Sequence, residues 1–163
     1  MNYLDNNTSN YFLKELSKIK NPIILELGVN KGGSTSEFLK HINEFGGDLY
    51  SIDIKDCANI INNEKFKDIN FLKWNFLQSN DLNLNKIFLK FPNLKNGIDI
   101  LYIDSYHDET HVKKTLEKWF YYVKKNGYIF FDDTESLIYR KKKNFALSVN
   151  NDSIDNLVKR FFY

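Results

Sequence analysis

The chain has 163 residues, of which 42% are hydrophobic and 16% aromatic, enough for one hydrophobic core of ordinary size. Its formal net charge of +2 is too small to indicate nucleic-acid binding, and its single cysteine, Cys57, excludes an intramolecular disulfide and a zinc site of several thiolates. The polar start at 1–10 and the lack of an apolar stretch approaching ~18 residues argue against a secretion signal and a membrane span. We therefore expect one cytoplasmic domain with no nucleic-acid or membrane partner.

The first half of the chain alternates between helical and extended patterns. Apolar residues at helical spacing predict a short leading helix within 1–20, which Pro22 ends. The pattern Ser34-Thr35-Ser36-Glu37 is typical of a capping box and predicts a helix from there to about Ile42, ended by Gly46-Gly47. Apolar runs predict strands at 23–27, 49–54 and 69–74.

The second half continues this alternation. Helical spacing predicts a helix at 84–91 and a longer amphipathic helix that starts near Asp108, extends to Val123 and is closed by Asn126-Gly127. Further strands are predicted at 98–103, at 128–131 and, after a basic loop, at 145–149. A last helix is predicted at 154–161.

Strands that alternate with helices predict an α/β fold with a Rossmann-like, doubly wound and mostly parallel sheet, because parallel neighbours need crossover connections. We expect a single domain over 1–163, with the leading helix at 1–20, a cofactor-binding core at 21–134, and a basic loop and terminal helix at 135–163. Ligands bind outside the carboxyl ends of such strands. The candidate site is therefore formed by the residues that follow the strands at 23–27, 49–54, 98–103 and 128–131.

A glycine-rich turn, Gly28 to Ser34, follows the first predicted strand. It departs from the dinucleotide fingerprint G-x-G-x-x-G, because Asn30 stands where a middle glycine is expected. Asparagine tolerates left-handed conformations, so the turn can still be sharp, but its side chain takes up space that a pyrophosphate needs. The turn therefore favours a smaller, uncharged group and argues against a nicotinamide dinucleotide.

Several blocks, in this order, make the chain resemble class I S-adenosyl-L-methionine-dependent methyltransferases. The blocks are Glu26 to Ser34, Asp53, Ile103 to His107 and Gly127 to Asp133, and the likeness covers roughly 21–134. The chain looks most like the methyltransferase domains of family 24 type, which are grouped with sugar O-methyltransferases and cephalosporin-hydroxylase-like proteins. This resemblance implies an enzyme that methylates a hydroxyl of a sugar or another small polar acceptor.

The resemblance also implies roles for individual residues in cofactor binding. The turn after the first strand would cradle the methionine end, and Glu26 would either lie beside its ammonium or orient the turn. Asp53 would accept both ribose hydroxyl protons, unless it only caps a turn or a helix. Asn75 and Phe76 would contact adenine, although Phe76 suits the core equally well. The cofactor-binding set is thus Glu26, Gly28, Asn30, Gly32, Gly33, Ser34, Asp53, Asn75, Phe76 and Asp104.

Three carboxylates, Asp104, Asp132 and Asp133, are predicted to follow neighbouring strands. Without a counter-charge they would repel one another, so their clustering is readily explained by Mg²⁺ or another divalent cation with oxygen ligands. Metal-dependent O-methyltransferases resemble this arrangement, and in them the ion lowers the pKa of a bound substrate hydroxyl. The alternative is that these aspartates only cap a loop and form local hydrogen bonds.

The histidines have different expected roles. His107, three residues after Asp104, is the candidate general base, since a neutral imidazole can accept the proton of the acceptor hydroxyl. The alternative is a structural histidine that caps the following helix. His41 and His111 are expected to be exposed helix residues, and Tyr106 either lines the acceptor pocket or covers the sheet.

The family usually continues past the fifth strand with a helix and an antiparallel strand pair, whereas this sequence ends at Phe161-Phe162-Tyr163. A compact sheet that lacks its last antiparallel strands is one expectation. Aromatic residues at the end also suit a homo-oligomer contact. The alternative function is a non-catalytic cofactor-binding or assembly module. A nicotinamide-dependent oxidoreductase is disfavoured because Asn126, not lysine, stands four residues after Tyr122.

Overall fold

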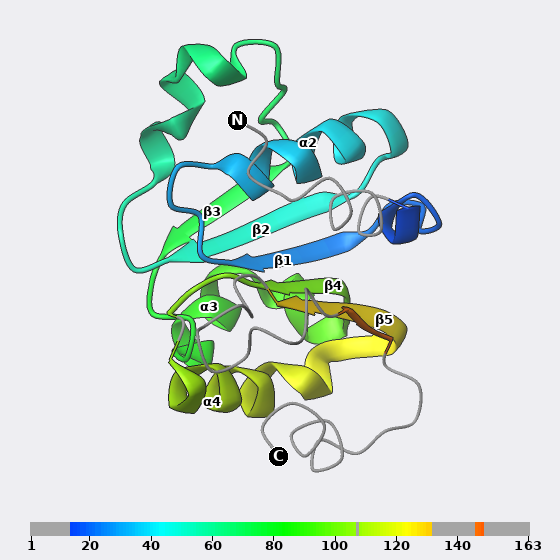
Figure 1. The fold of residues 1–163 in the computed structure, drawn as a ribbon, viewed down its shortest axis with the longest axis vertical. Coiled ribbons are helices and arrows are strands. Elements are labelled where there is room, and N and C mark those ends of the chain that lie inside the picture. Colours follow the sequence, from blue (N-terminus) through cyan, green and yellow to red (C-terminus); the bar gives the residue numbers. More distant parts are fainter. Residues whose placement is uncertain (1–13, 107, 132–145, 149–163) are drawn as a thin grey trace, which may run out of the picture.

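The computed structural model describes residues 14–106, 108–131 and 146–148, which form an α/β fold around one six-stranded sheet (Figure 1). The strand order is β3-β2-β1-β4-β5-β6. The first five strands are parallel, and β6 is antiparallel to β5. The strands are β1 (Ile23–Leu27), β2 (Asp48–Asp53), β3 (Trp74–Gln78), β4 (Ile98–Ile103), β5 (Val123–Phe131) and β6 (Ala146–Ser148).

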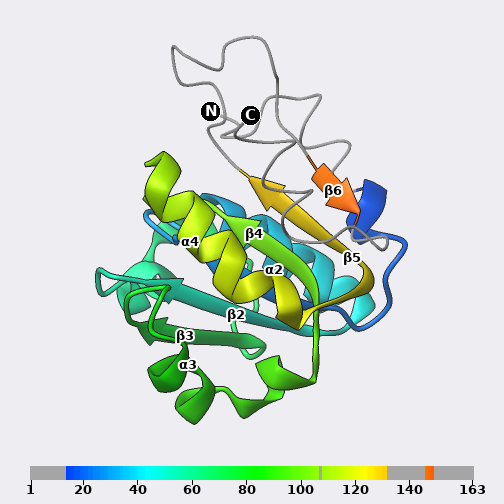
Figure 2. The same ribbon diagram turned by 90° about the horizontal axis from the view of Figure 1, so that it is seen from below.

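Helices cover both faces of the sheet. On one face lies α2 (Gly33–Phe45), and on the other lie α3 (Leu84–Lys90) and α4 (Glu109–Trp119), as Figure 1 and Figure 2 show. Neighbouring residues of β1 pack on opposite faces of the sheet: Ile24 packs in the cluster with α2, and Leu25 packs in the cluster with α3 and α4. Burial on both faces explains why β1 and β4 are continuous apolar runs rather than alternating ones.

Several predicted elements are confirmed. The strands at Ile23–Leu27 and Ile98–Ile103 have the predicted bounds, and β2 differs from its prediction by one residue at each end. The helix α2 ends where predicted, at Gly46, whose φ of 81° is in the left-handed region that favours glycine. The sheet is doubly wound and mostly parallel, and β6 falls within the strand predicted at 145–149.

The third strand was predicted about five residues too early. Residues 72 and 73 form a turn, at which Asn70 Oδ1 accepts a hydrogen bond from the N–H of Leu72 at 2.9 Å and the carbonyl of Phe71 accepts one from the N–H of Trp74 at 3.0 Å. Ile69 packs against the core from this loop, whereas Leu72 is 87% exposed. The apolar residues Ile69 and Phe71 therefore belong to a loop that packs on the core, and β3 begins only after the turn that Asn70 initiates, at Trp74.

The predicted end of the fourth helix was also wrong. The helix α4 ends at Trp119, a short 3₁₀ turn follows at Phe120–Tyr122, and Asn126 and Gly127 lie inside β5. They belong to a β-bulge, because Ile98 pairs with Val123 but Ile100 pairs with Tyr128. A Cβ at Gly127 would lie 2.9 Å from the carbonyl oxygens of Asp99 and Lys124. The glycine therefore serves the bulge rather than a helix end.

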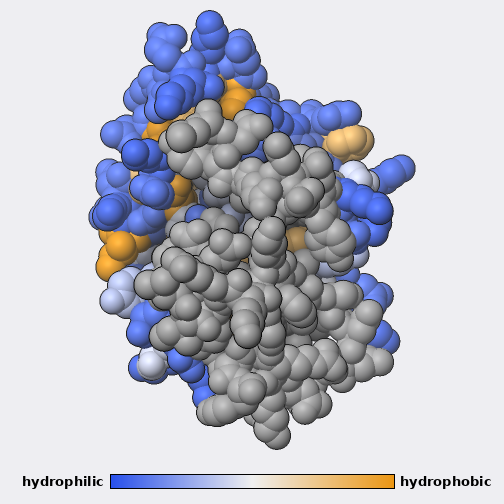
Figure 3. Space-filling model, viewed as in Figure 1, coloured by the Kyte–Doolittle hydropathy of each residue, from blue (hydrophilic) through white to orange (hydrophobic). Residues whose placement is uncertain are grey.

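The connection from β2 to β3 contains no α-helix. Two short 3₁₀ helices, η1 (Ala58–Asn62) and η2 (Glu64–Phe66), replace it, and a third, η3 (Pro92–Asn96), follows α3. No helix in the described part of the chain is long and apolar enough to cross a membrane. In the view of Figure 3, the described surface is mostly hydrophilic, with apolar residues in separate spots.

Parts of the predicted organisation lie outside the described residues. Of the leading helix, only its last part is described, and residues 14–16 are helical as predicted. The basic loop and the terminal helix predicted within 135–163 lie outside the described residues, apart from β6.

Candidate functional site

The glycine turn after β1 packs directly against the loop after β4. Gly28 donates a hydrogen bond to the carbonyl of Ile52 at 2.8 Å, and Asp104 donates one to the carbonyl of Leu27 at 2.8 Å. Gly28 has a φ of +98°, and a Cβ there would lie 2.0 Å from the carbonyl oxygen of Asp104. Only glycine fits this contact. The glycine at this position is therefore required by the close approach of the Asp104 backbone.

Glu26 is fully buried beneath this turn, where its carboxylate accepts three hydroxyl hydrogen bonds. Ser34 donates to Oε1 at 2.6 Å, and Thr35 and Ser51 donate to Oε2 at 2.8 and 2.6 Å. Burial raises the pKa of Glu26 to about 7, the three hydroxyl groups oppose this rise, and the charge of Asp104 adds to it. These contacts tie β1 and β2 to the start of α2, so Glu26 orients the turn.

The predicted capping box at Ser34 is wrong. The residue that caps α2 is Gly32, which has left-handed geometry and no side chain to form a capping hydrogen bond. The Ser34 hydroxyl donates to Glu26 instead of capping the helix. Left-handed geometry also occurs at Asn30, with a φ of 50°, so the prediction of a sharp turn there is confirmed. A Cβ at Gly32 would lie 2.8 Å from Cδ1 of Ile60, which shows that η1 covers this side of the turn.

Asp53, at the end of β2, holds the same turn from its other side. Its Oδ2 accepts hydrogen bonds from the backbone N–H of Val29 at 2.8 Å and of Asn30 at 3.1 Å, and its Oδ1 accepts one from Lys55 at 2.8 Å. Burial raises the pKa of Asp53, but these backbone donors outweigh burial and hold it below its usual value. The carboxylate thus has a structural role in the turn, and its contact with a ribose stays a prediction.

The residues assigned to adenine, Asn75 and Phe76, lie inside β3 and not after it. The Asn75 amide donates to the carbonyls of Leu49 at 3.2 Å and Lys73 at 3.4 Å, and Phe76 packs beside Trp74. This displacement follows from the misplaced third strand. The residues that leave the carboxyl end of β3 are Ser79, Asn80 and Asp81.

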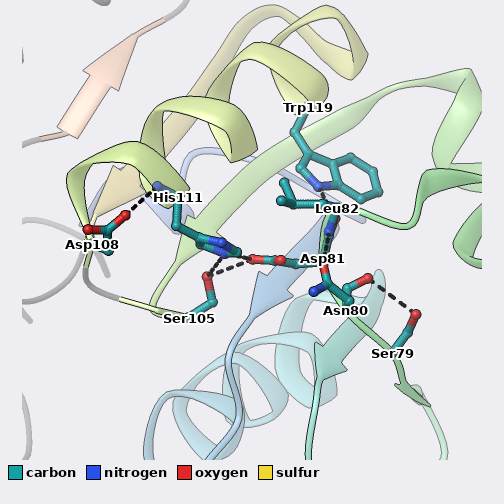
Figure 4. Close-up of polar contacts among 8 residues, drawn as sticks. All are labelled: Ser79, Asn80, Asp81, Leu82, Ser105, Asp108, His111 and Trp119. Atoms are coloured by element: carbon teal, nitrogen blue, oxygen red, sulfur yellow. Dashed lines mark hydrogen bonds and ion pairs between the residues drawn. The ribbon is translucent and has the colours of Figure 1, made fainter.

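Sequence reasoning missed a polar cluster of Asp81, Ser105 and His111, shown in Figure 4. Ser105 Oγ donates to Asp81 Oδ2 at 2.7 Å, and His111 Nε2 lies 2.9 Å from the same oxygen. The Asp81 side chain is only 7% exposed and that of His111 only 18%. The cluster joins the loop after β3, the loop after β4 and the first turn of α4.

Two backbone contacts fix this cluster in place. Trp119 Nε1 donates to the carbonyl of Asp81 at 2.9 Å, and Asp108, which caps α4, accepts from the N–H of His111 at 3.0 Å. With the third strand placed correctly, Asp81 would have been recognised as a residue that follows a strand, as its partner Ser105 follows the fourth strand. No local spacing connects residues 24 positions apart.

The prediction that His41 and His111 are exposed was wrong. His111 pairs with Asp81, and His41 is 7% exposed beside Phe45, with a ring centroid distance of 4.7 Å. Burial lowers the pKa of His41. Tyr106 is 70% exposed, so it does not cover the sheet, and its ring lies edge-on to His111 at 5.8 Å between centroids.

The predicted metal site and general base are only partly within the described chain. Asp104 is half-buried at the end of β4, whereas His107, Asp132 and Asp133 lie outside the described residues. Among the residues that the structure describes, no group of three or more His, Cys, Asp or Glu side chains is placed to hold a metal ion. The metal ligands and the base therefore stay predictions.

Comparison with known proteins places the chain among methyltransferases. Residues 25–134 match the family model described as a methyltransferase domain. Uncharacterized protein R132 of Acanthamoeba polyphaga mimivirus is 35% identical over 115 residues, which cover 67% of this chain and 50% of that protein. The chain thus spans about half the length of this relative.

Solved structures share the fold at lower sequence identity. The MycE methyltransferase from the mycinamycin biosynthetic pathway, solved with Mg and SAH, is 22% identical, with a TM-score of 0.59 over 82% of this chain and 33% of that chain. A putative rRNA methylase from Clostridium thermocellum is 14% identical, with a TM-score of 0.60 over 78% of this chain and 69% of that one. Both support the same Rossmann-like architecture.

Proposed function

Because this chain belongs to the methyltransferase-domain family, with the fold of class I S-adenosylmethionine-dependent enzymes, we propose that it methylates a hydroxyl of a sugar or another small polar acceptor. One observation carries the proposal. The turn from Gly28 to Ser34 is fixed by the carboxylates of Glu26 and Asp53 and packs against Asp104, all at the carboxyl edge of the sheet. Ligands of doubly wound sheets bind at this edge.

The chemistry of this edge fits S-adenosylmethionine. The cofactor carries hydrogen-bond donors on its ribose, its base and its ammonium, and the edge presents the carboxylates of Asp53, Asp81 and Asp104 as acceptors. The first turn of α2 offers backbone N–H groups and the positive end of a 13-residue helix to the cofactor's carboxylate. When bound, the cofactor supplies a methyl group already activated by a sulfonium.

We assign the base-binding position to Asp81 in place of Asn75 and Phe76. The resemblance puts adenine against residues that follow the third strand, and β3 ends at Gln78. Asp81 is buried in the loop that follows, with its carboxylate beside Ser105 at the end of β4. A carboxylate accepts hydrogen bonds only, which suits the exocyclic amine of adenine.

The acceptor hydroxyl needs a group that removes its proton, and His107 is our proposed base. Asp104, Asp132 and Asp133 are the proposed ligands of Mg²⁺, which would lower the pKa of a bound hydroxyl. The MycE methyltransferase, a protein of the same fold, was solved with Mg and SAH, which supports this choice. Holding the acceptor in line with the methyl group is then the main task of the protein.

Calorimetry with S-adenosylmethionine and S-adenosylhomocysteine tests the cofactor, and failure of both to bind would refute the proposal. Incubation with a panel of hydroxylated sugars, followed by mass spectrometry, tests the acceptor. Product formation that is lost in Asp133→Ala, which changes only a proposed metal ligand, while cofactor affinity is kept supports an enzyme. Cofactor binding without any product would favour a non-catalytic cofactor-binding module instead.

A further inference from the structure

The cluster of Asp81, Ser105 and His111 divides the two oxygens of one buried carboxylate between different tasks. Oδ2 accepts from Ser105 Oγ at 2.7 Å and lies 2.9 Å from His111 Nε2. Because a carboxylate only accepts hydrogen bonds, the proton at this contact sits on Nε2 of the ring. Within the described chain, Oδ1 accepts no hydrogen bond. One oxygen is thus held by the protein, and the other is left for a donor.

This carboxylate lies beside the glycine turn. A Cβ at Gly28 would be 3.0 Å from the backbone nitrogen of Ser105, so the turn and the cluster share the loop after β4. In Figure 4, the Asp81 carboxylate points toward Ser105 and the ring of His111, and the backbone carbonyl of Asp81 accepts a hydrogen bond from Trp119 Nε1 at 2.9 Å. The backbone of Asp81 is therefore fixed, and rotation of the carboxylate is limited by the two donors on Oδ2.

We propose that His111 is a positioning residue for cofactor binding, which aims the free oxygen of Asp81 at the exocyclic amine of the adenine ring. The inference rests on the proposed function. The ring of His111 is itself held on two sides, since its backbone N–H donates to Asp108 at 3.0 Å and Tyr106 lies edge-on to its ring. A histidine fixed in this way transmits the position of α4 to the Asp81 carboxylate.

The difference in affinity between two compounds that differ only at the exocyclic amine is a readout that a purely structural role of His111 would not change. S-inosylhomocysteine has a carbonyl oxygen where S-adenosylhomocysteine has the amine, so it cannot donate to Asp81 from that position. The wild-type chain is therefore expected to bind the adenine compound more tightly than the inosine compound, by roughly tenfold or more, because the mismatch leaves two acceptors facing each other. Calorimetry measures both affinities.

The matched variants are His111→Leu and His111→Gln. Leucine removes the donor, and we expect the preference for the adenine compound to fall by roughly five- to tenfold, the effect of one aligned hydrogen bond. Glutamine places an amide N–H near the position of Nε2 and is expected to keep the preference within about twofold. Asp81→Asn, whose amide can donate to the carbonyl oxygen of the inosine compound, is expected to reverse the preference.

Equal weakening of both compounds in His111→Leu would overturn the positioning role, because it would show general damage to the site. Should that variant not fold, Ser105→Ala removes the other donor to Oδ2 while His111 stays, so the preference is expected to persist, and its complete loss would overturn the role of His111. Failure of the wild-type chain to bind either compound would refute the proposed function itself. If the wild-type chain binds both compounds tightly and equally, only the role of Asp81 and His111 would be refuted.

Discussion

At the scale of single residues, the buried carboxylate of Glu26 links stability to pH. It accepts hydrogen bonds from Ser34, Thr35 and Ser51, yet burial dominates and raises its pKa to about 7 from the value of 4.5 taken for an unfolded chain. Between these two pKa values, the folded state binds more protons than the unfolded state. The stability contributed by protonated Glu26 is therefore present below about pH 4.5 and is lost as the pH rises through about 7.

We predict that the free energy of unfolding falls by about 3 kcal/mol between pH 4.5 and pH 8 because of Glu26, on the order given by such a shift. Urea unfolding of the wild-type chain and of Glu26→Gln at both pH values measures it. The variant has no proton to lose, so its stability should fall less than that of the wild-type chain. Parallel pH profiles for the two proteins would show that Glu26 does not titrate in this range.

The two glycines of the turn provide a second prediction. An alanine at Gly28 would place its Cβ 2.0 Å from a backbone carbonyl oxygen at a φ of +98°, whereas at Gly32 the nearest atom is the flexible end of Ile60 at 2.8 Å. Gly28→Ala is therefore expected to cost more than about 2 kcal/mol, and Gly32→Ala about 1 kcal/mol. Thermal unfolding ranks the two variants. A less stable Gly32→Ala protein would contradict the contact between Gly28 and the β4 loop.

At the scale of elements, the position of β3 is the feature that decides which residues reach the site. Leu77 lies within the strand and packs against the core shared by α3 and α4, while Leu72 lies in the preceding turn and is 87% exposed. Because Leu77 packs against the core and Leu72 is exposed, the same substitution is expected to cost different amounts of stability at the two positions. The strand thus carries Asp81, and not Asn75, to the carboxyl edge of the sheet.

We predict that Leu72→Ser changes the free energy of unfolding by less than about 0.5 kcal/mol, whereas Leu77→Ser costs about 1–3 kcal/mol. Chemical denaturation with a common fluorescence probe compares them directly. A strand at 69–74 would instead bury alternate residues of that segment. A large cost at Leu72 with none at Leu77 would therefore support the earlier strand position.

How far the sequence predicts these elements depends on where the signals are local. The strands β1 and β4 are buried on both faces, so their apolar runs and flanking glycines define them well. The strand β3 was misplaced because Ile69 and Phe71 are apolar residues of a loop that packs on the core. Hydrophobicity alone cannot separate the two cases, while the turn made by Asn70 depends on a single side chain.

The residues of the candidate site, like the strands, could be predicted only where the signal is local in the sequence. Glu26, Gly28 and Asn30 were found because they lie at the end of β1 and in the short motif that follows it, and the geometry of Gly28 and Asn30 agrees with the predicted turn. The pair of Asp81 and His111 is separated by 30 residues and is brought together only by the packing of α4 beside the loop after β3. No pattern within one segment indicates such a contact.

At the scale of the whole molecule, the two edges of the sheet carry different kinds of aspartate. At the carboxyl edge, Asp53 accepts from backbone groups of the glycine turn. At the opposite edge, Asp99 accepts from the N–H of Ile23 and from Lys124 Nζ, both at 2.8 Å. Both side chains tie neighbouring segments together, but only Asp53 lies where a ligand of this fold is expected.

This difference predicts that the same substitution, aspartate to asparagine, has different effects at the two edges. Asp53→Asn is expected to weaken S-adenosylhomocysteine binding by roughly tenfold or more, because the amide no longer accepts hydrogen bonds at both positions. Asp99→Asn removes the charge beside Lys124 and is expected to lower stability slightly while leaving this affinity unchanged. Calorimetry at a temperature where both variants are folded separates the two effects. Equal losses of affinity at both edges would mean that binding reports overall stability, and a loss at Asp99 alone would move the site to the opposite edge of the sheet.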